Sequence, residues 1–432
     1  MKKITFLAKS VFLAAVLLGA SNIQAQIELK VQTQMETRFS DVNDAGTGVT
    51  MYDYYDFETN QLTPIESEAF MMAQINNDEN VAGFMFYNEP EFILQAAYRK
   101  DGVWKPIGFA PEQNPNNYDE NFTYAISPNS KYITGQSNVD YDYGGFLYDT
   151  ETEELALTFD PEGEASSSYD VNDNGIMVGW VDRPDSGGTL RVPAYITLDG
   201  EYHLIPEGQL PTLTGDNTIQ GINNNNMMVG DFDLAPFIYD MNTDTFTSFD
   251  IPAGAVHAAF GSISENGIAV GYADVDFQVR DAIIYHPSLG DQPLYLKDVL
   301  ADNGIEVNTD DGLLGTAISI SPNGKYIAGW VNGAPQYAEG WMVYLDDLIL
   351  GTNHVSQNGV SFYPNPVSDV LHINSNETID SVAVYTITGQ RVSNITSNNN
   401  NKELNISNLA SGVYLVKVTS NGSVENLKVV KQ

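Results

Sequence analysis

The sequence predicts an all-β protein, a β-propeller of six or seven blades followed by a small antiparallel β-sandwich. A short motif recurs along residues 38–345: an apolar residue, a turn containing Asn or Ser, and a strand that ends on Gly. Further strands follow each copy, which gives four short strands about every 40–50 residues. The last part of the chain, residues 361–432, has a different pattern of alternating strands.

Six clear copies of the repeated motif begin at positions 75, 126, 171, 222, 263 and 320, and a degenerate copy begins at Val42. Asn and Gly accept the positive φ that tight hairpin turns need. The Gly that ends the second strand has no side chain, so a neighbouring backbone can approach it closely. Aromatic residues follow this Gly at Phe84, Trp180, Tyr272 and Trp330. Counting the degenerate copy, seven blades are favoured over six.

Most copies continue into a third and a fourth strand. Third strands are expected at 146–149, 194–196, 237–240, 282–285 and 341–344, and fourth strands at 155–159, 202–205, 246–249 and 293–296. The last copy lacks a fourth strand, and we expect residues 27–32 to supply it and close the ring. A single blade cannot bury both of its faces, so the blades must stack on one another. The alternatives are an open solenoid and a β-sandwich in which the turns recur by coincidence.

The blade pattern resembles two kinds of extracellular repeat. Residues 222–230 (INNNNMMVG), followed by the strand at 236–239 (PFIY), are similar to the extracellular HAF repeat family. Residues 321–327 (SPNGKYI) resemble the WD-like blades of periplasmic TolB-type propellers. The His of the HAF signature is absent before the third strand, so the resemblance implies a blade fold and no particular activity.

Residues 1–25 are predicted to be a secretory signal peptide. Lys2 and Lys3 precede an apolar run at 11–20, and cleavage is expected between Ala25 and Gln26. The run is too short for a transmembrane anchor, which needs about 20 apolar residues, and no transmembrane segment is expected in the mature protein. The chain has no Cys, which excludes disulfides, thiolate metal sites and a lipoprotein anchor.

Charge differs sharply between the two parts of the chain. Residues 26–350 hold 11 basic and 52 acidic side chains, a net charge of −41, whereas residues 351–432 hold five of each. Such acidity excludes nucleic acid as a partner and argues against anionic membrane surfaces. It is typical of a protein that must stay soluble in a salty medium, and it also fits a face that binds cations.

The blade pattern stops at Leu345, so we place the propeller at 26–346, a linker at 347–360 and an Ig-like β-sandwich at 361–432. The residues that characterise this last domain are Tyr363, Pro364, Asn365, Pro366, Gly389, Gly412, Tyr414, Lys428 and Lys431. In this order they resemble the type A C-terminal sorting domain of the type IX secretion system of Bacteroidetes. The resemblance implies export by the Sec translocon, passage through the periplasm and delivery by the type IX machinery. The protein would then lie at the outer cell surface, attached to surface polysaccharide, or in the medium.

Candidate metal ligands come from acidic loops. Asp170, Asn172 and Asn174 match the start of a calcium loop, but Val181 stands where that loop requires Glu. Two acidic pairs follow equivalent strands of neighbouring repeats, and we expect them on one face of the ring; these are Asp231 with Asp233 and Asp274 with Asp276. Calcium is the one cofactor that these loops suggest. The five His have no metal-ligand spacing.

The sequence contains no GxSxG nucleophile motif, no phosphate-binding Gly loop and no HExxH metalloprotease motif, so we expect binding rather than catalysis. The first interpretation is a secreted or cell-surface β-propeller binding protein whose ligand the sequence does not identify. One alternative is an extracellular hydrolase or lyase that acts on polysaccharide or peptide, and another is a structural or adhesive surface protein. A central pocket with converging carboxylates, or with a His oriented by a partner, would favour the enzyme.

Overall fold

The computed structural model describes residues 27–32, 38–65, 70–87, 93–140, 142–158, 165–184, 189–208, 210–212, 216–276, 279–309, 312–331, 339–345, 360–363, 367, 370–386, 391–410, 412–420 and 423–431. The signal peptide with its cleavage site at Ala25 and Gln26, and nearly all of the expected linker, lie outside these residues. None of the helices in the described part has the length and apolar character needed to cross a membrane.

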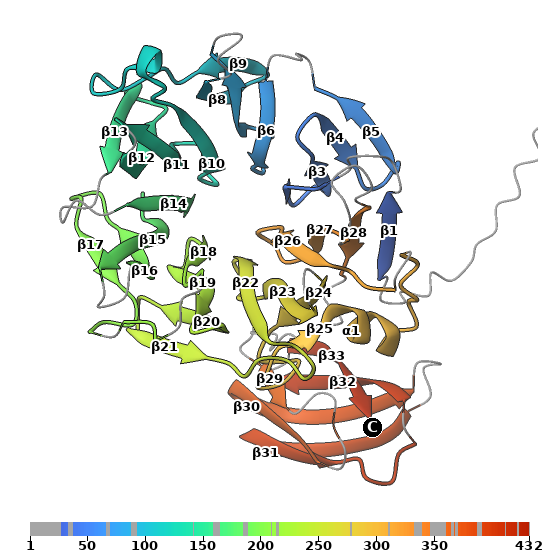
Figure 1. The fold of residues 1–432 in the computed structure, drawn as a ribbon. Coiled ribbons are helices and arrows are strands. Elements are labelled where there is room, and N and C mark those ends of the chain that lie inside the picture. The colour runs from blue at the N-terminus through green and yellow to red at the C-terminus, as the bar shows by residue number, and fades with distance from the viewer. Residues whose placement is uncertain are drawn as a thin grey trace, which may run out of the picture.

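Seven four-stranded antiparallel sheets make up the first part of the chain, as expected for a β-propeller (Figure 1). The first consists of β2 (Asp41–Val42), β3 (Thr47–Val49), β4 (Asp53–Asp56) and β5 (Gln61–Pro64). The second consists of β6 (Phe70–Ile75), β7 (Val81–Phe86), β8 (Leu94–Lys100) and β9 (Val103–Pro106). The third, which follows the short helix η1 (Pro115–Asn117), consists of β10 (Asn121–Ile126), β11 (Tyr132–Val139), β12 (Asp142–Asp149) and β13 (Glu154–Thr158).

The remaining four sheets repeat this plan. The fourth has β14 (Ser166–Val171), β15 (Met177–Pro184), β16 (Thr189–Ile196) and β17 (Tyr202–Leu204). The fifth has β18 (Ile219–Ile222), β19 (Met227–Phe232), β20 (Ala235–Asp240) and β21 (Thr245–Ser248). The sixth has β22 (His257–Ile263), β23 (Ala269–Asp276), β24 (Val279–Tyr285) and β25 (Leu294–Tyr295). The seventh has β26 (Thr316–Ile320), β27 (Tyr326–Trp330), β28 (Gly340–Tyr344) and β1 (Glu28–Gln32).

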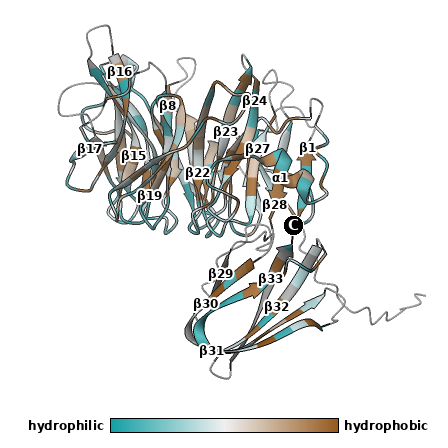
Figure 2. Ribbon diagram, turned by 90° about the horizontal axis from the view of Figure 1, so that it is seen from below, coloured by the Kyte–Doolittle hydropathy of each residue, from teal (hydrophilic) through white to brown (hydrophobic). Residues whose placement is uncertain are grey.

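The sheets form a closed ring around a central axis. The innermost strands touch one another in the cyclic order β2, β6, β10, β14, β18, β22, β26 and back to β2. The strands run between the two faces of the ring (Figure 2). We call the face with the Asn and Ser turns between first and second strands the turn face, and the opposite one, with the loops between second and third strands, the loop face.

The N-terminal strand completes the seventh sheet, as predicted. β1 pairs antiparallel with β28, with Glu28 opposite Tyr344 and Gln32 opposite Gly340. Leu29 and Val31 pack against the apolar cluster of the seventh sheet. The first and last segments of the ring therefore share one sheet.

The repeated Gly is required by a close backbone approach, also as predicted. A Cβ atom added to Gly179 would lie 1.9 Å from the carbonyl oxygen of Ser167, and one added to Gly230 would lie 1.8 Å from that of Thr218. Both sites lie beside a bulge in the innermost strand, where the pairing register shifts. The bulge turns the next residue of that strand, Asp170 in the fourth sheet, toward the centre of the ring.

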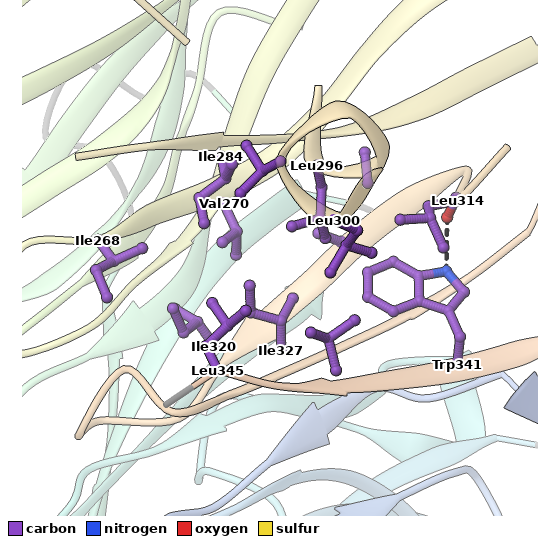
Figure 3. Packing of buried hydrophobic residues seen from close by; sticks show 14 of the residues in the cluster. Ile268, Val270, Ile284, Leu296, Leu300, Leu314, Ile320, Ile327, Trp341 and Leu345 are labelled. Carbon is purple, nitrogen blue, oxygen red and sulfur yellow. Dashed lines mark hydrogen bonds between the residues drawn. The ribbon is translucent and has the colours of Figure 1, made fainter. Parts of the chain in front are cut away.

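Helix α1 (Leu296–Asp302) replaces part of an expected strand. We predicted a fourth strand over 293–296, but β25 ends at Tyr295, and the chain then turns into the helix. Leu296 and Leu300 of α1 pack among apolar side chains of the sixth and seventh sheets (Figure 3). The Trp341 indole in the same cluster donates a hydrogen bond of 2.6 Å to the carbonyl oxygen of Leu314. The gap between these two sheets is filled by the helix.

The C-terminal part forms a sheet with its own core. It consists of β29 (Val360–Tyr363), β30 (Val370–Thr386), β31 (Arg391–Asn405), β32 (Gly412–Ser420) and β33 (Ser423–Lys431). All five strands join in one hydrogen-bonded sheet, in which β30 pairs with β29, β31 and β32. The core holds Leu371, Val382, Val416 and Val429, among others, and no residue of the ring. The expected division into two sheets stays a prediction.

Truncation of Val31 tests the closure of the ring. Val31→Ala should lower the free energy of unfolding by about 1 kcal/mol, because it removes partly buried apolar surface from the last sheet. Val103→Ala is the matched control, since Val103 also lies in an outermost strand but is exposed. Urea denaturation of both variants provides the measurement. Equal midpoints for the two variants would contradict the packing of the Val31 side chain against the last sheet.

Candidate functional site

A central channel runs through the ring and narrows at one level, which we call the waist. Two cavities, of about 70 Å³ toward the turn face and about 560 Å³ toward the loop face, meet there. The waist residues occupy the same repeat position, directly before the motif, in five sheets and line both cavities; they are Asp41, Gln74, Asp170, Ser262 and Ser319. The cavity toward the loop face is the larger space, and we call it the funnel.

The waist side chains tie each sheet to a neighbouring one. Asp41 accepts a hydrogen bond of 2.9 Å from the backbone N–H of Ile75, in the second sheet. Asp170 accepts one of the same length from Ile222 in the fifth sheet. The hydroxyl of Ser319, in the last sheet, donates to Asp41 in the first. These bonds give the waist residues a structural role. Because the waist residues share one repeat position, their side chains are all placed to reach a neighbouring sheet.

The two waist carboxyl groups have raised pKa values. Burial raises the pKa of Asp41 to about 7, although hydrogen bonds from Ser319 and the backbone oppose the shift. Burial likewise raises the pKa of Asp170 to about 6. The negative charge of Asp170 adds to the shift of Asp41, so the two groups influence each other across the channel.

Aromatic side chains surround the funnel above the waist. Tyr124, Tyr169, Tyr272 and Trp330 line it, together with Asp216. The rings of Tyr124 and Tyr169 lie edge to face with their centroids 5.1 Å apart. Burial raises the pKa of all three tyrosines, so they are hydrogen-bond donors at neutral pH. The funnel volume lies within the range of small-ligand pockets.

Charged side chains of the fifth and sixth sheets meet beside the funnel. His257 Nδ1 lies 2.8 Å from Asp274 Oδ2, and His257 Nε2 lies 3.5 Å from Asp231 Oδ2. Burial of the imidazole acts to lower its pKa, but the two carboxylates outweigh it, so the pKa of His257 is raised. Arg280 Nε donates to Asp274 Oδ1 at 2.9 Å, and its guanidinium lies 3.6 Å from the centre of the Tyr272 ring.

The structure brings together only part of the predicted acidic set. Asp231 and Asp274, from loops of neighbouring sheets, meet at His257. Asp233 instead accepts hydrogen bonds from the backbone and hydroxyl of Thr212. Asp276 lies at the end of β23, where its Cα pairs with Val279.

The calcium candidates do not converge either. The Asp170 carboxylate lies at the waist, whereas the amides of Asn172 and Asn174 both donate to Asn226 in the next sheet, at 3.0 and 3.1 Å. Within the described ranges, no group of three or more His, Asp or Glu side chains is placed to hold a metal ion.

Sequence reasoning missed His257, Arg280 and Arg38. The guanidinium of Arg38 lies 4.5 Å from the centre of the Trp330 ring, although the two residues are at opposite ends of the ring's sequence. The signal that could have located the funnel was the aromatic residue after the repeated Gly. Tyr272 and Trp330 line the funnel, and the Trp180 indole donates a hydrogen bond of 2.9 Å to the Tyr169 hydroxyl.

The residues expected to characterise the C-terminal domain are partly described. Tyr363 ends β29, Gly412 begins β32, and Lys428 and Lys431 lie in β33. Tyr414 is buried, and its hydroxyl donates 2.9 Å to the carbonyl oxygen of Ala410. Pro364, Asn365, Pro366 and Gly389 lie outside the described residues.

A protein-family comparison matches residues 361–432 to the secretion system C-terminal sorting domain. The match agrees with the resemblance inferred from the tail and indicates a protein sorted by the type IX secretion machinery to the cell surface or the extracellular space. None of the curated proteins compared with the chain matches it.

Solved structures with similar folds have low sequence identity to this chain. PorZ of Porphyromonas gingivalis, described as an essential bacterial surface component of the type IX secretion system, is 13% identical with a TM-score of 0.43; the alignment covers 93% of this chain and 59% of PorZ. An oligogalacturonate lyase from Vibrio parahaemolyticus is 13% identical with a TM-score of 0.45, over 76% of this chain and 95% of the lyase. TolB from Acinetobacter baumannii is 12% identical with a TM-score of 0.36, over 59% of this chain and 60% of TolB.

The raised pKa of Asp41 predicts a pH dependence of stability. Because burial raises the pKa of Asp41, the folded protein keeps the proton up to pH about 7, whereas the unfolded chain releases it near the ordinary Asp pKa of 3.8. The folding stability of the wild type therefore falls as the pH rises from 3.8 to about 7. Asp41→Asn stays neutral, so it does not lose stability in this range. At about 1.4 kcal/mol per pKa unit, the stability of the variant relative to wild type should rise by about 3 kcal/mol between pH 5 and 8.

Urea denaturation at pH 5 and pH 8 measures this difference. Asp78→Asn is the control, because Asp78 is exposed in a turn and its substitution should leave the pH dependence unchanged. A constant difference between Asp41→Asn and wild type at the two pH values would show that the waist carboxyl titrates normally.

Proposed function

We propose that this chain is a secreted β-propeller of seven blades that binds a ligand in the funnel on its loop face. The observation that supports the proposal is the funnel itself, an aromatic-lined cavity of about 560 Å³ at the centre of the ring. Cavities of this size with a few polar groups among aromatic walls are typical binding sites.

Export is proposed to follow the route that the sorting domain implies. The Sec translocon carries the chain to the periplasm, and signal peptidase cleaves between Ala25 and Gln26. The type IX machinery then delivers the protein to the outer surface, where surface polysaccharide retains it or the medium receives it.

Binding is favoured over catalysis by the way the titratable groups are engaged. His257 Nδ1 is bonded to Asp274, and Nε2 is buried 3.5 Å from an Asp231 carboxylate oxygen, so the imidazole is held within the protein. Asp41 and Asp170 accept backbone hydrogen bonds from neighbouring sheets, which fixes them in structural positions.

One observation supports a hydrolase or lyase as the second candidate. Asp41 and Asp170 are two carboxyl groups in one channel, with pKa values raised to about 7 and about 6. Glycoside hydrolysis uses one protonated and one ionised carboxyl group, and environments that shift such pKa values set these roles. Release of reducing sugar from extracellular polysaccharides by wild type, and its loss in Asp41→Asn, would favour this candidate over simple binding.

The export route predicts where the mature protein begins and where a chain without the sorting domain is retained. Native protein recovered from the cell surface or medium should begin at Gln26, as read by N-terminal sequencing or mass spectrometry. Deletion of residues 361–432 should leave the remaining chain in the periplasm, because the signal for the outer-membrane step is gone. Recovery of the truncated chain outside the cell would contradict the route.

The binding function predicts that funnel aromatics are needed for ligand capture. Full-length protein is applied to glycan and peptide arrays, with and without calcium. Trp330→Ala should abolish or weaken the captured signal at least tenfold, because the ring forms part of the funnel wall. Tyr143→Ala is the control, since Tyr143 is an exposed aromatic residue that does not line the funnel. Capture that survives Trp330→Ala would place the binding surface elsewhere.

A further inference from the structure

Three arginines stack on aromatic rings that line the funnel or, in the case of Trp180, bond to a residue that lines it. Arg191 lies 4.2 Å from the ring centre of Trp180, Arg280 lies 3.6 Å from that of Tyr272, and Arg38 lies 4.5 Å from that of Trp330. All three aromatic residues directly follow the repeated Gly. Residues 26–350 hold only 11 basic side chains. Three of them lie near this one cavity, which distinguishes the funnel region from the rest of the acidic ring.

Two of the pairs share one construction. In the fourth sheet Arg191 is opposite Asp182, and in the sixth sheet Arg280 is opposite Asp274. In each case the Asp stands three positions after the repeated Gly and the aromatic residue stands one position after it. In both sheets, a guanidinium therefore lies over an aromatic ring and opposite an Asp, which is a hydrogen-bond acceptor.

The charges at the mouth compensate one another. Arg280 Nε lies 2.9 Å from Asp274, and Arg191 lies 3.6 Å from Asp216. An anionic ligand would compete with these carboxylates and approach a ring of net charge −41, while a cationic ligand would meet three guanidinium groups. The arrangement therefore suits a ligand without net charge that offers both donors and acceptors.

Polar groups at Trp330 are left without partners in the described structure. Thr316 lines the funnel with only 3% of the residue exposed, and its buried hydroxyl has no hydrogen-bond partner. Thr316 is the register partner of Trp330, so its side chain lies next to the indole on the same side of the sheet. Arg38 Nε, from the guanidinium stacked on the same indole, is also buried and unpartnered. Unpaired buried polar groups are costly, and a ligand hydroxyl would satisfy them.

An extended peptide fits the funnel less well than a sugar. A peptide strand would need free backbone N–H groups on the innermost strands. At the waist these groups are already bonded to side chains of the preceding sheets, as at Ile75, Ile126 and Ile222. A sugar ring instead offers apolar C–H faces to the aromatic rings and hydroxyl edges to the polar groups.

We propose that the funnel binds a neutral oligosaccharide, with one sugar ring packed on Trp330 and its hydroxyl groups bonded to Thr316 and Arg38. The proposal rests on the funnel being the binding site, and it adds the chemical class of the ligand. The Arg–Asp pairs at Tyr272 and Trp180 then contact further sugar units at the mouth.

The ligand class is tested with full-length protein on arrays of neutral glycans, glycans that contain uronic or sialic acid, and peptides. We expect every signal that depends on Trp330 to come from neutral glycans. Acidic glycans or peptides that bind through Trp330 would overturn the ligand class and leave the funnel as the binding site. The absence of any signal that depends on Trp330 would overturn both the ligand class and the proposed function.

Thr316→Val tests the contact itself, with the neutral glycan found on the array. Affinity measured by calorimetry should fall about three- to tenfold, the effect of one lost hydrogen bond. Stability should not fall, because the Thr316 hydroxyl makes no bond within the described protein. The matched control is Thr134→Val, whose buried hydroxyl donates 2.7 Å to the carbonyl oxygen of Phe146. This control should lose stability and keep its affinity. Unchanged affinity in Thr316→Val would overturn the proposed contact.

Discussion

The ring depends on hydrogen bonds that pass from one sheet to the next at equivalent positions of the repeat. At the waist, side chains such as Asp41 and Asp170 reach the backbone of the following sheet. On the turn face, the N–H of Asp173 donates to the Asn224 side chain, and that of Asn224 donates to Glu265. The series returns to its start where Asn323 donates to Asp44 at 2.7 Å. Because each bond joins two sheets, the polar residues of the repeat stabilise the contacts between sheets as well as their own turns.

This dependence explains which features could be predicted from the sequence. The turn residues, the Gly at the close approach and the N-terminal strand that completes the last sheet all follow from local backbone requirements, and all three appear where expected. Helix α1 could not be predicted, because an apolar run such as that at 293–296 is compatible with strand or helix and the space between two sheets decides. The sorting domain was recognisable from its own residues, and the family comparison agrees.

The candidate site was less predictable, because its contacts cross between sheets. Equivalent loops of neighbouring repeats placed Asp231 and Asp274 on one face, but the residue that joins them, His257, lies in neither motif. Arg38 reaches Trp330 only because the ring closes and brings the first and last sheets together. Register predicts the level of a side chain along the axis of the ring, whereas its partner depends on packing between neighbours.

The pairing of β1 with β28 also sets the order in which the molecule can be assembled. Residues 28–32 are synthesised first, yet their partner strand, 340–344, is among the last parts of the ring to leave the ribosome. Joining two segments so far apart in the chain carries the largest loop-closure entropy of any pairing in the ring. Six sheets can therefore form from consecutive strands, but the first sheet lacks its neighbour in the ring until the seventh is complete. The sorting domain follows that seventh sheet, so a chain truncated before β28 during translation would have neither a finished toroid nor the signal that takes it out of the cell.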